Sequence, residues 1–482
     1  MKKGISLILA IVIVFALAAC GAPGGAKVNY WPKTAPDAGT VNSASWELDI
    51  DDIGRDETII SVSPSGKHIL TASRLTQDMS RRFESGVANH FGLTVEYIAV
   101  YTLEDGEYNR TSRIRINRDR DPELNDTLAV SGADGVAWSE DETRALVTVG
   151  LFQTRMYMRQ AHANIYLVDF AEESFERLTE TPGRPDGGDY NALPQWVDDK
   201  NIMFVRMNFS ADGDFRARLT GVSLDTGEQS LLADLSADGR VVPVFDYVVS
   251  GDNVYFNRNG MSLDFTGLFV ATMDGGVGRV RRLVTLDRLR EREIHPYASS
   301  LTSVQISQDG RWACLTVYDN RLAMRDFPFR DDPVNPQPDP ASAHSVANGQ
   351  PWVPCHNVLL YDLENDELVD PFTADELAPD VSVAIGATLA PDGKSLLCAV
   401  LGDGGVWRMH KFFTEVSVYQ IRLDDESFDA VKVFETKLDN YILPDLLSWL
   451  GNNSLLLRSS LGPTPTYPVQ IVKPAAFGAF DK

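Results

Sequence analysis

The chain has few of the residues that metal and thiol chemistry require. It contains 4 cysteines and 7 histidines among 482 residues, with no CxxC spacing and no clustering of the histidines. A protein metal site needs several such ligands close together. We therefore expect neither a metal nor another cofactor. Cys314 and Cys398 fall at similar places in their repeats, and we expect both to be buried as small apolar side chains. A disulfide between Cys314 and Cys355 is the alternative.

Positive charge is also scarce. The sequence has 44 Lys and Arg against 68 Asp and Glu, which gives a formal net charge of -24. Such a balance opposes binding of nucleic acid or of anionic lipid by the body of the domain. We therefore expect no nucleic-acid partner.

Long hydrophobic runs are missing beyond the N-terminus. One run extends from Ile5 to Leu17, follows Lys2 and Lys3, and ends in small residues. It is shorter than the about 20 residues that span a membrane. The three parts instead match a secretory signal peptide, which we assign to residues 1–19.

The end of this run carries a lipidation signal. Leu17-Ala18-Ala19-Cys20 resembles the lipobox of bacterial lipoproteins. The resemblance implies cleavage before Cys20, lipidation of that residue by acyl chains such as palmitate, and anchoring in the lipid bilayer. The alternative is an ordinary signal peptide that leaves Cys20 as a free thiol. Residues 20–44 are rich in Gly, Ala and Pro, and we expect a lipidated Cys followed by a flexible tether.

One pattern recurs through the rest of the chain: an apolar stretch, a polar turn and a second apolar stretch. The copies begin at Val62, Ala137, Gln195, Tyr247, Gln305, Leu389 and Ser448. Such repeats predict an all-β fold, a β-propeller of seven four-stranded blades over residues 45–474, with residues 475–482 as a tail. Six or eight blades are the alternatives. Residues 45–51, SWELDID, alternate like a strand, and we expect them to complete the seventh blade and close the ring.

The repeats resemble a known family. SPSGK, QDGR and PDGK before an apolar strand, followed by IYLVDF and RLTETPG, are similar to the repeats of TolB-type propellers. The resemblance covers nearly all of the mature chain. It does not extend to the role of TolB in envelope integrity, because TolB has six blades and an additional N-terminal domain.

The long insertions between the second and third strands of the repeats indicate a site. Such insertions lie on one face of a propeller, and here they are rich in arginine and aromatic residues. This mixture suits carboxylates, phosphates or anionic sugars. The candidate ligand-binding rim comprises Arg81, Arg82, Arg155, Tyr157, Arg159, His162, Arg321, Arg325, Arg330, Trp352, Trp407, Arg408 and His410. The alternative is that each arginine pairs with an Asp of a neighbouring blade.

Arginines also recur inside the repeats. Arg206, Arg258 and Arg458 each follow an Asn by five residues in aligned copies. We interpret them as repeat architecture, with such an arginine bridging adjacent blades by pairing with an Asp such as Asp169 or Asp362.

Catalytic motifs are absent from the sequence. There is no GxSxG, which excludes the serine peptidases that join a similar propeller to an α/β-hydrolase domain. We therefore expect no enzyme, but a monomeric extracytoplasmic lipoprotein that binds or scaffolds an envelope protein or an anionic wall-derived glycan or peptide. Its membrane would be the cell membrane, or the outer membrane in a Gram-negative host. The alternative is a propeller lyase or glycosidase acting on an envelope polysaccharide.

Overall fold

The computed structural model describes residues 44–47 and most of residues 57–473. The gaps between the described residues are 48–56, 74–94, 96, 105–106, 117–127, 154–161, 182–188, 210–214, 237–242, 259–265, 276–278, 287–297, 308–309, 320–345, 348–349, 352–355, 370–382, 391–393, 402–405, 409–410, 424–429, 440–443, 451–453 and 460–468. The expected signal peptide, the tether up to residue 43 and the C-terminal tail lie outside the described residues. Within those residues every regular element is a β-strand. No helix among them is long and apolar enough to cross a membrane.

Strand pairing in the first half of the chain follows the expected repeats. Repeat 1 comprises β2 (Glu57–Val62), β3 (His68–Ser73), β4 (Tyr97–Glu104) and β5 (Glu107–Arg115). Repeat 2 comprises β6 (Leu128–Trp138), β7 (Arg144–Gln153), β8 (His162–Asp169) and β9 (Ser174–Arg177). Repeat 3 comprises β10 (Asp189–Asp198), β11 (Asn201–Phe209), β12 (Phe215–Ser223) and β13 (Gln229–Asp234). Repeat 4 comprises β14 (Val244–Ser250), β15 (Asn253–Arg258), β16 (Gly267–Thr272) and β17 (Arg281–Thr285).

The second half continues the same plan. Repeat 5 comprises β18 (Ala298–Ile306), β19 (Trp312–Asp319), β22 (His356–Asp362) and β23 (Glu367–Val369), and the hairpin of β20 (Val346–Ala347) and β21 (Gln350–Pro351) precedes β22. Repeat 6 comprises β24 (Val383–Leu389), β25 (Ser395–Leu401), β27 (Lys411–Arg422) and β28 (Ala430–Asp439), with β26 (Val406–Arg408) also paired to β27. Repeat 7 comprises β29 (Pro444–Leu450), β30 (Ser454–Ser459) and β31 (Val469–Lys473).

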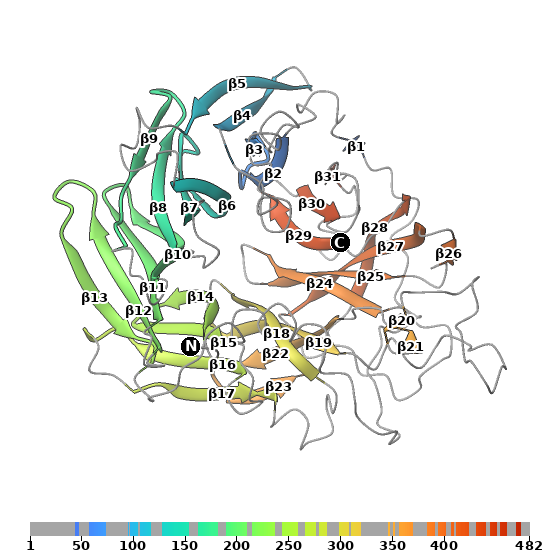
Figure 1. Cartoon of the computed structure of the whole chain (residues 1–482). Coiled ribbons are helices and arrows are strands. Elements are labelled where there is room, and N and C mark those ends of the chain that lie inside the picture. The colour runs from blue at the N-terminus through green and yellow to red at the C-terminus, as the bar shows by residue number, and fades with distance from the viewer. Residues whose placement is uncertain are drawn as a thin grey trace.

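The N-terminal strand completes the last repeat. β1 (Ala44–Glu47) pairs antiparallel with β31, with Ala44 opposite Lys473 and Glu47 opposite Gln470. The expectation that residues from this region add the fourth strand is therefore confirmed. Figure 1 shows the repeats following one another around the molecule, from blue at the top through green on the left and yellow at the bottom to orange and red. The all-β propeller is confirmed. The blade count stays a prediction, because repeats 2 and 3 share one sheet through a contact of β8 with β10.

Apolar side chains fill the space between successive repeats. Between repeats 1 and 2, Leu70 and Ile114 pack with Val147 and Tyr166, all with no exposed surface. Between repeats 5 and 6, Cys314 and Cys398 lie in a similar cluster. Both cysteines are free and buried, as expected, so the alternative disulfide of Cys314 is not formed. Burial raises the pKa of the Cys314 thiol to about 12, and the thiol therefore behaves as a small hydrophobe.

Hydrogen bonds link the first strands of successive repeats around the centre. Alternate side chains of a strand point in opposite directions. In β10, accordingly, Gln195 donates forward to the carbonyl of Tyr247 at 3.0 Å, while the indole of Trp196 donates back to the carbonyl of Ala137 at 3.0 Å. The equivalent Trp138 donates back to Ser61 at 2.9 Å. Each such bond contributes about 1 kcal/mol.

The same linkage continues through repeats 4 to 6. The Asp246 carboxylate accepts the backbone N–H of Val304 in repeat 5. Gln305 then donates to the carbonyl of Ala387 at 3.3 Å and accepts the N–H of Leu389 at 2.8 Å. Side chains of the first strand therefore tie each repeat from 1 to 6 to its neighbour.

Candidate functional site

The antiparallel strands give the propeller two different ends. The turns that join the first strand to the second, and the third to the fourth, lie at one end, which we call the turn end. The connections between the second and third strands, and between repeats, leave from the opposite end, which we call the connection end. The strands on either side of the long insertions end and begin at the connection end.

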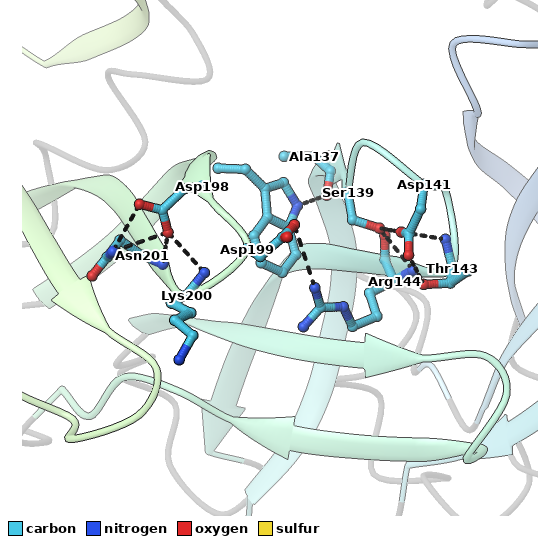
Figure 2. Close-up of polar contacts among 10 residues, drawn as sticks. Ala137, Ser139, Asp141, Thr143, Arg144, Asp198, Asp199, Lys200 and Asn201 are labelled. Atoms are coloured by element: carbon cyan, nitrogen blue, oxygen red, sulfur yellow. Dashed lines mark hydrogen bonds and ion pairs between the residues drawn. The ribbon is translucent and has the colours of Figure 1, made fainter.

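At the turn end, the turn side chains satisfy their own backbone. Asp141 accepts from the Ser139 hydroxyl at 2.7 Å, from the Thr143 N–H at 3.1 Å and from the Thr143 hydroxyl at 2.8 Å (Figure 2). These bonds lower the pKa of Asp141 to about 2. Asp198 likewise accepts the N–H groups of Lys200 and Asn201, both at 2.8 Å. In such turns the carboxylate oxygens already accept N–H groups of the same turn.

Neighbouring turns also contact one another. The N–H of Ser65 in repeat 1 donates to the carboxylate of Glu142 in repeat 2 at 2.6 Å. The Arg144 guanidinium lies 4.0 Å from the Asp199 carboxylate of repeat 3 (Figure 2). It also lies 5.0 Å from the centre of the Trp196 ring. The turn end of repeats 1 to 3 is therefore a surface whose charged groups bind each other.

Most of the predicted rim lies outside the described residues, between strands that end or begin at the connection end. His162 is the first residue of β8, opposite Leu151. Trp407 and Arg408 lie in β26, opposite Phe412 and Lys411. The side chains of these three are not among those described. Arg81, Arg82, Arg155, Tyr157, Arg159, Arg321, Arg325, Arg330, Trp352 and His410 all fall in the gaps, as does Cys20. The rim as a binding site therefore stays a prediction.

The connection end of repeat 1 holds a buried carboxylate. Glu57, the first residue of β2, is 5% exposed. It accepts from the hydroxyl of Thr71 at 2.6 Å and from those of Tyr97 and Tyr101, both at 2.9 Å. The Arg110 guanidinium lies 3.5 Å away and balances its charge. Burial and the bond to Glu57 raise the pKa of Tyr97 to about 12, so its hydroxyl stays a donor.

Three arginines lie on the same face of repeat 1. Arg110, Arg113 and Arg115 of β5 are all exposed. They are not among the residues predicted from the sequence, because they follow no long insertion. The signal that could have found two of them is the RIR at the end of RTSRIR, which places Arg113 and Arg115 at alternate positions of a strand.

The described hydrogen bonds of two repeat arginines go to amide and carbonyl oxygens. Arg206 donates to Asn191 at 3.0 Å and to Gln229 at 2.8 Å, both within its own repeat. Arg258 is 1% exposed, lies over two Phe rings, and donates to the backbone carbonyl of Leu235 in the preceding repeat. It therefore bridges two repeats, but the acceptor is a carbonyl. The side chain of Arg458 is not among those described.

The two aspartates named as partners are engaged in turns. Asp169 accepts the N–H groups of Ala171 and Glu172 at 3.0 and 2.9 Å. Asp362 accepts those of Glu364 and Asn365 at 3.0 and 2.9 Å. An Asp at the end of a strand stabilises the following turn in this way, which is why these positions recur in the repeats.

A second buried polar group lies at the connection end of repeat 4. Asp246 of β14 stands opposite Asn257 of β15, so both side chains point to one face of the sheet. Burial raises the pKa of Asp246 to about 6, although the N–H groups of Val304 and Tyr247 favour its charged form. Asn257 has no exposed surface, and within the described part of the chain neither atom of its amide has a hydrogen-bond partner. Such an unsatisfied group is rare in protein interiors and commonly marks a water or a functional site.

Comparison with known proteins yields similarities of fold. No family model matches the chain, and no curated protein matches it. Among solved structures, an oligogalacturonate lyase of Vibrio parahaemolyticus is 12% identical with a TM-score of 0.44, covering 91% of this chain and 98% of its own. A prolyl endopeptidase is 12% identical with a TM-score of 0.43, covering 87% of this chain and 47% of its own. The WD40 domain of SCAP from fission yeast is 10% identical with a TM-score of 0.36, covering 90% and 94%.

These similarities correct one prediction. The expectation that the chain is not an enzyme was wrong, because enzymes are among the solved structures to which it is similar: a lyase and peptidases. The missing GxSxG motif excludes one serine-peptidase chemistry and not catalysis in general. At identities of 10 and 12% and TM-scores below 0.5, the structures reported above assign no activity, substrate or partner to this chain.

Proposed function

We propose that the chain is an extracytoplasmic lipoprotein, anchored through Cys20, whose propeller binds an envelope protein or an anionic wall-derived glycan or peptide at its connection end. The lipobox-like sequence before Cys20 supports the anchor. The arginine-rich and aromatic insertions support an anionic ligand. The propeller acts in this proposal as a rigid frame that presents these insertions together.

The observation that carries the proposal is the difference between the turns of repeats 2 and 3 and the connection end of repeats 1 and 4. Turn-end side chains such as Asp141 and Asp198 are occupied by bonds within their own turns. At the connection end, Arg113 and Arg115 are exposed and Asn257 is buried without a partner among the described residues. Groups with unused hydrogen-bonding capacity at one end of a closed frame favour binding at that end.

The anchor is tested by acylation and the binding by charge removal. The full chain, expressed in a bacterial host with an alkyne-labelled fatty acid, should incorporate the label and partition into detergent. Cys20→Ala should abolish both.

For binding, the paired change Arg155→Gln and Arg159→Gln should weaken retention of envelope glycan at least tenfold. Retained label in Cys20→Ala would contradict the anchor, and unchanged retention would contradict the predicted rim.

A second candidate function is catalysis on an envelope polysaccharide, as a lyase or glycosidase. The observation that favours it is Asp246, whose pKa of about 6 lets the carboxyl exist in both protonation states near neutral pH. The test is release of reducing ends or unsaturated products from isolated wall polysaccharide. Asp246→Asn should abolish turnover, whereas Asp141→Asn at the turn end should leave it unchanged. No turnover by the unaltered chain would remove this candidate.

A further inference from the structure

The exposed arginines of β5 form a row on one face of repeat 1. In the register of the sheet, Arg115 stands opposite Tyr97 and Arg110 stands opposite Tyr101. Cross-strand partners point to the same side of a sheet, so the guanidinium groups share the face of the two tyrosines. Because β5 is the last strand in the order β2-β3-β4-β5, the row lies at the outer edge of the repeat.

Contacts with a buried carboxylate and an aromatic ring orient the central arginine of the row. The buried Glu57 carboxylate accepts the Tyr97 hydroxyl at 2.9 Å, which fixes the tyrosine ring. The Arg113 guanidinium lies 3.8 Å from the centre of that ring. Stacking on an aromatic face orients a guanidinium while its N–H groups remain in its plane, available to an acceptor. Arg113 is therefore ordered before any ligand arrives.

Two of the three arginines in the row have no ion-pair partner among the described residues. Among the described ion pairs, Arg110 lies 3.5 Å from Glu57, and none involves Arg113 or Arg115. Both of these arginines are exposed, in a chain whose formal net charge is -24. An unpaired guanidinium favours carboxylate or phosphate, with which it forms two parallel hydrogen bonds. The row is thus a local surface of opposite sign to the body of the protein.

The spacing of the arginines in the row favours a polymeric ligand with repeated negative charges over a single small anion. Residues two apart in a strand are about 6.6 Å apart, so Arg113 and Arg115 are separated by about the length of one monomer unit. Arg110 extends the row, since the bulge between Val100 and Tyr101 keeps it on the same face. β5 ends at Arg115, so a polymer bound along the row would extend to the connection end.

We propose that Arg110, Arg113 and Arg115 bind a linear anionic polymer that carries carboxylate or phosphate groups on successive units. This inference rests on the proposed function, and it adds the ligand class and a second contact surface outside the predicted rim. Tyr97 orients the central arginine, and Glu57 fixes Tyr97. The polymer lies along the outer edge of repeat 1.

Binding of defined polymers to the full chain in detergent tests the row. The ligands are a polyuronate, an inorganic polyphosphate and uncharged dextran, measured by calorimetry at two salt concentrations. We expect one charged polymer to bind more weakly at higher salt, and dextran not to bind. The paired change Arg113→Gln and Arg115→Gln should weaken that binding at least tenfold. The matched control is Arg281→Gln with Arg282→Gln, which removes two exposed charges from the edge strand β17 and should change affinity less than twofold.

The outcomes separate this inference from the proposed function. If the paired change at Arg113 and Arg115 leaves affinity within twofold while Arg155→Gln with Arg159→Gln weakens it, the rim stands and the row is overturned. If both pairs weaken binding, both surfaces contribute. If neither charged polymer binds the unaltered chain, the row is overturned, while an envelope protein remains open as the partner at the rim. Thermal unfolding of each variant within about 2 °C of the unaltered chain confirms that the fold is kept.

Discussion

The turns of repeats 2 and 3 and the connection end of repeats 1 and 4 use polar residues in opposite ways. At the turn end, Asp141 and Asp198 are exposed, and their bonds close the turns in which they lie. At the connection end, Glu57 and Asn257 are buried. Glu57 accepts a hydrogen bond from Tyr97 on another strand, and the Asn257 amide has no partner among the described residues. Short turns need local hydrogen bonds to form at all. A buried polar group is costly unless it is paired, so it is retained where it holds or binds something.

The largest expected effect is at Glu57. Glu57→Ala removes the acceptor of Thr71, Tyr97 and Tyr101 and leaves the donors facing a cavity. We expect the free energy of unfolding to fall by about 3–5 kcal/mol, as measured by denaturant titration. Glu57→Gln keeps one acceptor oxygen and should cost less. A loss below 1 kcal/mol in the Ala variant would mean that this end is not held by its buried polar groups.

A smaller effect, of opposite sign, is expected at Asp246. Its folded pKa is raised to about 6 by burial, so the folded state favours the protonated carboxyl. The stability that this contributes is present below about pH 4 and is lost as the pH rises through 6. Asp246→Asn should therefore stabilise the chain by up to about 2 kcal/mol at pH 7.5 and change little at pH 4. Unfolding titrations of both proteins at the two pH values measure the difference, and destabilisation at pH 7.5 would contradict this assignment.

The smallest effect is expected at the turn end, with the opposite pH dependence. The pKa of Asp141 is lowered to about 2 by its turn bonds, so its contribution is present above about pH 4 and is lost as the pH falls through 2. Asp141→Asn should cost at most about 1 kcal/mol at pH 7.5, because the carboxylate is exposed and screened by water. The same titrations check it. A larger cost than at Glu57 would reverse the comparison of the two ends.

The sequence predicted the features that depend on local pattern. Alternation of apolar residues around a polar turn located the hairpins, the N-terminal strand and the buried Cys314 and Cys398, because each depends only on strand period. Partners far apart in the sequence were not predictable in this way. The bond from Arg258 to the carbonyl of Leu235 is an example, because the packing of two repeats sets that distance.

The arginine row was missed for a related reason. The face on which Arg110 lies depends on a bulge between Val100 and Tyr101, and a one-residue shift of register would move it to the opposite face. Asp246 also follows a bulge, which lies between Val244 and Asp246. Bulges leave no clear mark in the sequence, although they decide which side chains share a surface.

The most direct test of the account is hydrogen exchange of the full chain with and without the charged polymer that binds it. Binding at the connection end predicts slower exchange in peptides that cover β4 and β5 and in peptides from the predicted rim. Peptides that cover the turns at residues 139–143 and 198–200 should exchange at unchanged rates. Protection confined to those turns, with none in β5 or the rim, would contradict the assignment of binding to the connection end.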